Sequence, residues 1–333
     1  MSAPRVLLTN DDGPPDHKES PYVLGLYRHL TEDLGWDVKV VLPSSQKSWI
    51  GKAYHIKEVT KGLYFYPRED GEGETSPKPR PLRPGEIAEW ILLDGTPATC
   101  ANVALHNIYP GQFDLVISGP NLGRNTSAAF ALSSGTIGAA LSSSLSKIRS
   151  IALSYGTVLH PTPTTFFEPA HRLGARIIGH LWENWGNDTG GLRDGEVDLY
   201  SVNIPLLEGL LTEEGLKICS TTMWRNSYGR LFKRTSDKAT PVEPGQVRSA
   251  GSDALDVIIP SNGKALDDQE ELSFKFSPDM TGLITPSLSS LPVGSDGWAI
   301  YQGWVSVTPL RAAFGEPLHP EIDAEERIWK MKL

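Results

Sequence analysis

The sequence predicts an α/β protein with a Rossmann-like, doubly wound and mostly parallel sheet, followed by C-terminal β-hairpin or arm extensions. Short apolar runs alternate with amphipathic segments from Arg5 to Pro205, which is the rhythm of successive βαβ units. Each apolar run ends in a short polar or glycine-rich loop, as expected where ligands bind at the edge of a parallel sheet. After Pro205 the rhythm changes to strand-like segments separated by Pro, Gly and polar residues.

The first βαβ unit lies within the first 43 residues. Residues 5–9 predict a buried strand, apolar residues recur at helical spacing over 23–34, and Gly35 suits a C-terminal cap. A second strand is expected at 37–43, and the G-x-G-x-x-G dinucleotide fingerprint is absent. The next segment, SSQKSWIGKAYHI, begins as a polar loop and is a candidate edge strand at its end.

Further strands and helices follow in the same alternation. A strand ends at Leu93, and Thr96 with Pro97 suits the start of a helix. The remaining predicted elements are the strand FDLVISG, the loop GPNLGRN, a helix with Ile137, Leu141, Leu145 and Ile148 on one face, the strand SIALSYG, a helix over 166–181 and the strand VDLYSVNIP. This order continues the doubly wound pattern.

Two regions depart from that pattern. Residues 67–84 are dense in Pro, Gly and charge, which predicts a mobile surface excursion. Beyond residue 205 the segments LKICSTTMW, ALDVIIPSNG and GWAIYQGWVSVTPL are strand-like. We therefore expect a catalytic core at 1–205 and a β-rich extension at 206–333, whose final strand returns to the core.

Composition excludes several classes of function. The net charge of −9 disfavours a partner such as a nucleic-acid duplex, which requires a basic surface. With two cysteines the chain has no disulfide framework, and Cys100 is expected to be a core thiol. No segment has the apolar length of a membrane span or the pattern of a signal peptide. We expect a cytoplasmic protein with no membrane partner.

Oxygen-bearing side chains follow the first two strands. Asn10, Asp11 and Asp12 come directly after the first strand, and Ser45 and Ser48 lie in the loop after the second. Such hard oxygen ligands suit Mg²⁺, Mn²⁺ or Ca²⁺ rather than zinc. The stretch NDDG is also a good β-turn. Two adjacent acids repel each other, however, unless something positive lies between them.

A possible phosphate cradle begins the helix after the fourth strand. Asn121 and Asn125 lie in the loop after that strand, and Ser134, Gly135 and Thr136 begin the helix. Free N–H groups and the helix dipole favour an anion there, although SSGT is equally suited to ordinary N-capping. A divalent ion beside a phosphate cradle is the arrangement that phosphoryl chemistry requires.

These motifs resemble those of the survival protein E (SurE) phosphatase/nucleotidase family. The segments VLLTNDDG, LDGTPATC, DLVISGPNLGRN, SSGTIGAAL, VNIP and GWVSVTPL occur here in the family's order, densely up to residue 155 and sparsely beyond. GPP after the acids and SSGTIGAAL are similar to the fungal, acid-phosphatase-like branch. The resemblance implies a Rossmann-like core, C-terminal strands that exchange between subunits, and a homodimer or homotetramer.

The resemblance also implies a metal site. Its ligands would be Asp11, Asp12, Ser48 and Asn121, holding one Mg²⁺ or Mn²⁺ per subunit. The family serine is normally followed by glycine, whereas Trp49 and Ile50 stand between Ser48 and the next glycine here, so Ser45 is the alternative. The segment PPDHKESP is longer than in compact bacterial members, and the Pro-rich excursion has no counterpart in the family.

We therefore expect a metal-dependent phosphomonoesterase, a nucleotidase or acid phosphatase, acting on nucleoside monophosphates and in some members on short polyphosphate. Asp11, Asp12 and Asn121 are the expected catalytic residues. The expected phosphate-binding residues are Asn10, Asn125, Ser134, Gly135 and Thr136. Attack by water and attack by Asp11 to form an aspartyl-phosphate both remain open. The alternatives are a non-catalytic nucleotide- or phosphate-binding regulator and a sugar-transfer enzyme, for which no donor-site motif is evident.

Overall fold

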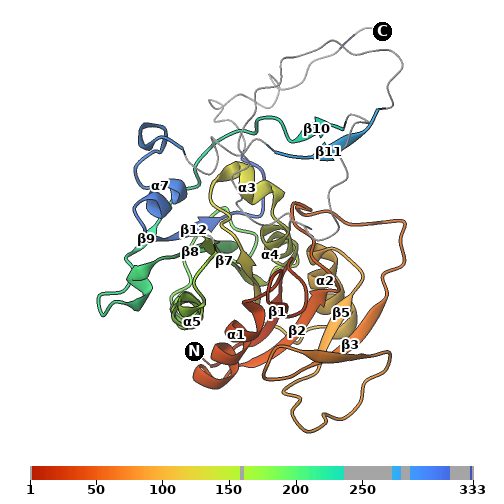
Figure 1. Cartoon of the computed structure of the whole chain (residues 1–333). Coiled ribbons are helices and arrows are strands. Elements are labelled where there is room, and N and C mark those ends of the chain that lie inside the picture. Colours follow the sequence, from red (N-terminus) through yellow and green to blue (C-terminus); the bar gives the residue numbers. More distant parts are fainter. Residues whose placement is uncertain (1, 158–160, 236–271, 279–285, 316–330, 332–333) are drawn as a thin grey trace.

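A ten-stranded mixed sheet forms the centre of the molecule, with strand order β4-β3-β5-β2-β1-β6-β7-β8-β12-β9 (Figure 1). The computed structural model describes residues 2–157, 161–235, 272–278, 286–315 and 331. The strands are β1 (Arg5–Thr9), β2 (Asp37–Pro43), β3 (Gly62–Pro67), β4 (Gly73–Ser76), β5 (Trp90–Leu93), β6 (Leu115–Leu122), β7 (Arg149–Thr157), β8 (Leu199–Leu206), β9 (Ile218–Ser220) and β12 (Val305–Leu310). A separate two-stranded sheet pairs β10 (Phe232–Arg234) with β11 (Phe274–Phe276).

The six strands from β5 to β8 run parallel, which confirms the predicted fold class. In the middle of the sheet Val6 of β1 lies opposite Val38 of β2 and Leu115 of β6. Strands β3 and β12 are antiparallel to β5 and β8. All eight residues of β8 are buried, as expected for a parallel strand covered on both faces.

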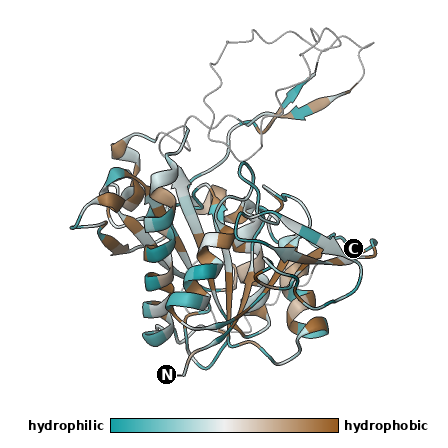
Figure 2. Cartoon of the chain, turned by 60° about the horizontal axis from the view of Figure 1, so that its bottom comes forward, coloured by the Kyte–Doolittle hydropathy of each residue, from teal (hydrophilic) through white to brown (hydrophobic). Residues whose placement is uncertain are grey.

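Helices cover both faces of the sheet. They are α1 (Val23–Arg28), α2 (Pro97–Val103), α3 (Ser127–Ser133), α4 (Gly135–Leu145), α5 (Phe167–Glu183) and α7 (Asp296–Tyr301). Helices α1 and α5 share one apolar core with the sheet, whereas α2 and α4 pack in separate clusters with other strand side chains. Figure 2 shows apolar residues along the strands and polar residues on outer helix turns. Cys100 is buried in the core, as expected.

The region after β2 differs from the prediction. No strand lies between residues 44 and 61, because the next strand, β3, begins only at Gly62. The Pro-rich segment 67–84 is also not a loop throughout, since β4 pairs antiparallel with β3. Arg80 in this segment stacks 3.8 Å from the centre of the Tyr66 ring and bonds to Glu86 at 2.7 Å. These contacts hold the Pro-rich segment 67–84 against the edge of the sheet.

Three helix assignments also differ. Helix α3 has no counterpart among the predicted elements, and α4 ends at Leu145, which leaves Ile148 outside the helix. Leu145 is 51% exposed and so does not belong to the buried face. The stretch GWAIY forms α7 instead of a strand, and only the following WVSVTPL contributes a strand, β12. The strand-like ALDVIIPSNG lies outside the described residues.

The C-terminal part of the described chain contributes to both sheets. Strand β12 pairs with β8 and β9 in the main sheet, whereas β10 and β11 project from the sheet as a short arm (Figure 1). The division of the chain at residue 205 and the role of the arm in oligomerisation stay predictions. No single described helix has the length and apolarity to cross a membrane; α3 and α4 meet that test only as a pair bent by 72°.

Candidate functional site

The acidic turn lies at the carboxyl end of β1, in the middle of the sheet. Asp11 and Asp12 are only 3% and 4% exposed. Asn10 closes the turn, because its side-chain amide donates to the carbonyl of Gly13 at 2.8 Å and accepts from the N–H of Gly13 at 2.9 Å. Gly13 has φ +91°, which favours glycine. The carboxylates themselves are therefore not needed to form the turn.

The start of α4 faces the carboxylate of Asp11. The Thr136 hydroxyl donates to Oδ1 of Asp11 at 2.6 Å, and the backbone N–H groups of Gly135 and Thr136 also donate to this carboxylate. Ser134 caps the helix by accepting from Ile137 N–H. Burial raises the pKa of Asp11, and the donated hydrogen bonds oppose that rise. The N-terminus of α4 was predicted to bind a phosphate. In this structure it binds the carboxylate of Asp11 instead.

Asp12 faces the end of β6. Its Oδ2 accepts the backbone N–H of Leu122 at 2.8 Å. Burial raises the pKa of Asp12 well above its usual range, and repulsion from Asp11 raises that pKa further. Among the described residues, no Lys, Arg or His forms an ion pair with either carboxylate. Two buried acids therefore lie side by side without a cationic side chain to balance them.

Asn121 lies next to Asp12, because Leu122, which follows Asn121 in the chain, donates its N–H to Asp12. The Asn121 amide nitrogen donates to the carbonyl of Gly123 at 2.8 Å. That bond orients the side chain and leaves Oδ1 of Asn121 without a hydrogen bond from the described residues. Asn121 therefore offers a neutral oxygen beside the acidic turn.

The loop after β2 runs along the same turn. The Lys47 N–H donates to the carbonyl of Asp11 at 2.7 Å. A Cβ placed on Gly135 would lie 3.0 Å both from Oδ2 of Asp11 and from Cγ2 of Ile50. Ser48 lies between these two loop contacts and is half-buried, whereas Ser45 is exposed. This position favours Ser48 over Ser45 as the loop serine of the site.

Aromatic rings cover the outer side of this loop. Trp49, at φ +60°, places its ring centre 5.3 Å from that of Phe276 on β11, 6.0 Å from Tyr228 and 6.2 Å from Phe130 on α3. The Tyr228 hydroxyl also donates to the carbonyl of Ala129 on α3. The arm is thereby attached to the loop that borders the acidic turn.

Asn125 belongs to a buried network behind the site. Its side chain donates to the Ser154 hydroxyl at 2.9 Å, and its backbone N–H donates to Oδ1 of Asn203 at 2.7 Å. The network joins the loop after β6 to strands β7 and β8. Asn203 was not predicted from the sequence, although it belongs to the quoted motif VNIP at the end of an apolar strand.

Asp296 is a second residue that sequence reasoning missed. It is 1% exposed and accepts N–H groups from Ser127, Trp224 and Gly297 at 2.7, 2.9 and 2.7 Å. These bonds tie α7 to the start of α3, just after the loop that follows β6 and contains Asn125. The only signal in the sequence is the helix-start pattern Ser295-Asp296-Gly297.

The donor set fits a hard divalent cation. Asp11, Asp12, Asn121 and Ser48 supply carboxylate, amide and hydroxyl oxygens, as Mg²⁺ and Mn²⁺ prefer. No cluster of three or more His, Cys, Asp or Glu side chains is found among the described residues, so the protein ligands of a zinc centre are not assembled there. A divalent ion would offset the burial and mutual repulsion that raise the pKa values of both acids.

Comparisons with known proteins identify the family. A model of the Survival protein SurE family matches residues 6–230. A Caulobacter protein named 5′-nucleotidase SurE is 26% identical, covering 92% of this chain and 87% of its own length. Another protein of that name, from Archaeoglobus fulgidus, is 27% identical, covering 92% and 91%. The crystal structure of the SurE protein from Aquifex aeolicus aligns over 94% of this chain and 95% of its own, with a TM-score of 0.57 at 22% identity.

A yeast relative has a different name. A Saccharomyces cerevisiae protein named probable tubulin–tyrosine ligase PBY1 is 32% identical over 93% of this chain. This chain spans only 41% of the length of that protein. The ligase activity in its name is therefore assigned to a protein much longer than this chain.

Proposed function

We propose that this chain, which belongs to the SurE family, is a divalent-metal-dependent phosphomonoesterase that hydrolyses nucleoside monophosphates. The observation that supports this most is the pair of adjacent carboxylates, Asp11 and Asp12, each almost fully buried without a cationic side chain among the described residues. Desolvating two like charges is costly unless a cation compensates them. Relatives named 5′-nucleotidase SurE support the same reaction class.

In this proposal Asp11, Asp12, Asn121 and Ser48 hold one Mg²⁺ or Mn²⁺ per subunit. When bound, such an ion polarises a phosphoryl oxygen and lowers the pKa of bound water. The chain's own contribution is to hold both carboxylates in place. Donors from Thr136 and from the backbone of α4 hold Asp11, and Leu122 N–H holds Asp12.

The phosphate would lie beside α4 and the loop after β6. The helix start at 134–136 and the amide of Asn125 stay the proposed phosphate-binding groups, although in this structure the N–H groups of Gly135 and Thr136 donate to Asp11 and Asn125 donates to Ser154. Because Asn10 closes the turn with both polar atoms of its amide, we assign its contribution to shaping that turn. The phosphate oxygens would then be steadied from the α4 side as charge redistributes during transfer.

The test uses the purified full chain and a panel of phosphate monoesters. AMP, 3′-AMP, p-nitrophenyl phosphate and a short polyphosphate are incubated with and without EDTA, and released phosphate is measured. We expect release from at least one ester that EDTA stops and that Mg²⁺ or Mn²⁺ restores. Binding of AMP without phosphate release would instead identify the regulator alternative, and release that is insensitive to EDTA would contradict a metal-dependent reaction.

Matched variants separate the acidic turn from ordinary surface acids. Asp11→Asn and Asp12→Asn should abolish phosphate release while the circular dichroism spectrum is unchanged. Asp94→Asn, at the exposed end of β5, makes the same chemical change outside the site and should retain activity. An acid-labile phosphoprotein trapped during turnover by the unmodified protein would indicate attack by Asp11, and its absence would favour water.

We also propose that the chain forms a homodimer or homotetramer through its C-terminal arm. The arm exposes aromatic side chains that a subunit contact would cover, since Phe232 and Phe274 are 54% and 59% exposed. Light scattering coupled to gel filtration gives the oligomeric state directly. A monomer at micromolar concentration would contradict this part of the proposal.

A further inference from the structure

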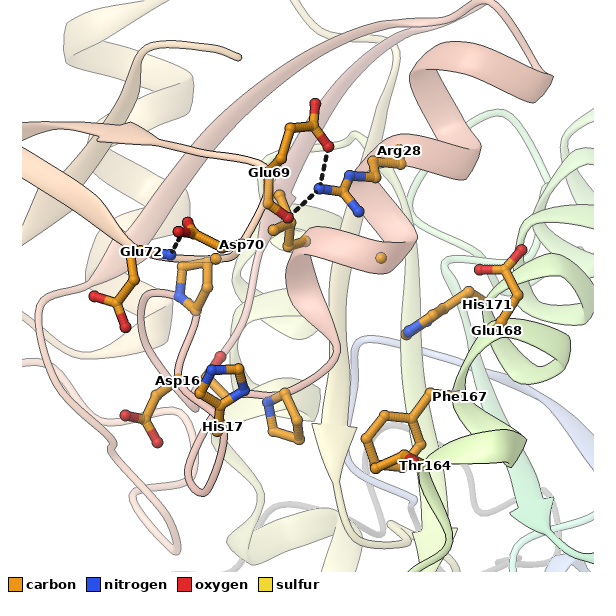
Figure 3. A pocket seen from close by; sticks show the side chains of 16 residues that line it. Asp16, His17, Arg28, Glu69, Asp70, Glu72, Thr164, Phe167, Glu168 and His171 are labelled. Atoms are coloured by element: carbon orange, nitrogen blue, oxygen red, sulfur yellow. Dashed lines mark hydrogen bonds and ion pairs between the residues drawn. The ribbon is translucent and has the colours of Figure 1, made fainter. Parts of the chain in front are cut away.

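A cavity of about 370 Å³ lies on the face of the sheet covered by α1 and α5 (Figure 3), and one of its lining residues, Ser20, donates to the carbonyl of Gly13 in the acidic turn. Its walls come from residues 15–21, α1, the turn between β3 and β4, and the start of α5. None of the residues proposed for metal or phosphate binding lines it. The volume is suited to a small molecule rather than to a folded partner.

His171 of α5 presents a hydrogen-bond acceptor to this cavity. The side chain is 4% exposed, and its Nδ1 lies 3.2 Å from the Tyr155 hydroxyl. That hydroxyl donates to the carbonyl of Ala170 at 3.2 Å, so Nδ1 is the protonated nitrogen that donates to Tyr155. The lone pair of Nε2 is left without a partner among the described residues, and the ring points into the cavity (Figure 3).

Carboxylates gather on the opposite wall. Asp16, Asp70 and Glu72 lie across the cavity from His171 (Figure 3). Asp16 and Asp70 accept backbone N–H groups through one oxygen each, and the Glu72 carboxylate has no partner among the described residues. This wall therefore carries three exposed carboxylates, none of which forms an ion pair with another described residue.

The remaining charged groups of the lining are largely paired. Glu69 bonds to Arg28, and Glu168 turns toward His29 and Arg172 outside the cavity. Among the described lining residues the cations are Arg28 and, when protonated, His17. The excess of acceptors over donors favours a ligand that donates N–H hydrogen bonds and is positively charged.

Apolar side chains also line the cavity. They belong to Pro15, Pro21, Leu24 and Phe167. A single metal ion has no use for such surface, and the described residues contain no metal-binding cluster of three or more His, Cys, Asp or Glu. A chain of methylene groups with an amine at each end matches a cavity whose lining offers carboxylates, apolar side chains and the lone pair of Nε2 of His171.

We propose that this cavity binds a linear aliphatic polyamine. One ammonium group lies at the wall that carries Asp16, Asp70 and Glu72, the methylene chain packs along Leu24 and Phe167, and the far amine donates to Nε2 of His171. The inference is independent of the phosphatase proposal, because the cavity shares no residue with the acidic turn.

The test is isothermal titration of spermidine into the purified full chain in EDTA, which keeps metal out of the acidic turn. Asp70→Asn combined with Glu72→Gln removes two charges from an exposed turn, so the fold is retained, and should weaken binding about fivefold. The matched control combines Glu183→Gln with Glu213→Gln, which removes the same charge from exposed positions outside the lining and should leave binding unchanged.

A further variant tests the lone pair. His171→Phe keeps an aromatic ring but removes Nε2, and should weaken spermidine binding about tenfold, provided that circular dichroism shows a folded protein. Equal affinity of the Asp70→Asn/Glu72→Gln variant and its control would overturn the proposal, because it would indicate general attraction to an acidic surface. Absence of any heat or thermal shift with millimolar spermidine would overturn it as well.

Discussion

The Thr136 hydroxyl donates a hydrogen bond of 2.6 Å to Oδ1 of Asp11, although the two residues lie 125 positions apart in the chain. The bond joins the start of α4 to the carboxyl end of β1. Because it favours the ionised form of a buried acid, it opposes the rise in the Asp11 pKa that burial causes. Thr136 thus favours the ionised form of Asp11 before any ligand binds.

Replacing Thr136 with Val should lower kcat about tenfold or more. The side chain keeps its shape but loses a hydrogen bond to a charged group, which contributes about 1.5–3 kcal/mol. Losing this donor also raises the pKa of Asp11, so the acidic limb of the pH–rate profile should move to higher pH. Thr136→Ser keeps the hydroxyl and should stay near the unmodified rate. Equal rates for the Val and unmodified proteins would contradict this role.

Gly135 lies where Asp11, the loop after β2 and α4 come together. A Cβ there would lie 2.8 Å from Cβ of Asp11 and 3.0 Å from Cγ2 of Ile50. We therefore expect Gly135→Ala to displace the acidic turn and to lower both phosphate release and Mn²⁺ affinity. Circular dichroism should change little, because alanine is a better helix former than glycine.

Gly179→Ala is the matched control for this substitution. It also lies in a helix, but its Cβ would meet only Leu34, at 3.9 Å, and should leave activity unchanged with a slight gain in stability. Manganese affinity is measured by calorimetry and activity by phosphate release. A fully active Gly135→Ala protein would show that the turn tolerates displacement.

Much of the fold was predictable because buried parallel strands have a local signature. The runs RVLLT, DVKVVLP and LYSVNIP are apolar in sequence and are strands β1, β2 and β8 in the structure. Each run ends in a polar loop, so the edge of the sheet where Asp11 and Asp12 lie could also be located. In a parallel sheet covered on both faces, the pattern that forms the strand also identifies its ends.

Helix α3 was not predictable in the same way. It begins at Ser127, whose φ of +78° is unusual for a non-glycine residue. The Ser127 N–H is held there by Asp296, 169 residues along the chain. Likewise, the aromatic residues of GWAIY favour a strand by propensity, but that segment forms α7 beside Trp224. Contacts distant in sequence decide both elements, and no local pattern records them.

Asp296→Ala should destabilise the protein by about 3–5 kcal/mol, because three buried N–H groups lose a charged acceptor. The loss should release the start of α3 and lower phosphate release by disturbing the loop between Asn121 at the end of β6 and α3. Asp296→Asn keeps an acceptor oxygen and should lose less. Differential scanning calorimetry measures stability, and limited proteolysis between residues 121 and 127 reports the loop. An unchanged melting temperature for the Ala variant would contradict the proposed tie.

His171 should make stability depend on pH. Its pKa is lowered from 6.5 to about 4, mainly by burial and then by repulsion from His29, whereas Glu168 opposes the shift. The uncharged Tyr155 hydroxyl bonds to Nδ1. The unfolded chain therefore binds a proton that the folded chain does not. Stability from this group is complete above pH 6.5 and is lost as pH falls toward 4. The full loss is about 3 kcal/mol, from the size of the pKa shift.

His171→Phe isolates this contribution from that of the acids, which also titrate over this range. The variant has no imidazole to protonate on unfolding, so its free energy of unfolding should fall less steeply than that of the unmodified protein between pH 6.5 and 4. Urea unfolding at half-unit pH steps gives both curves. Lost packing shifts the whole variant curve by a constant amount, whereas the imidazole changes its slope. Parallel curves would therefore contradict a neutral buried His171.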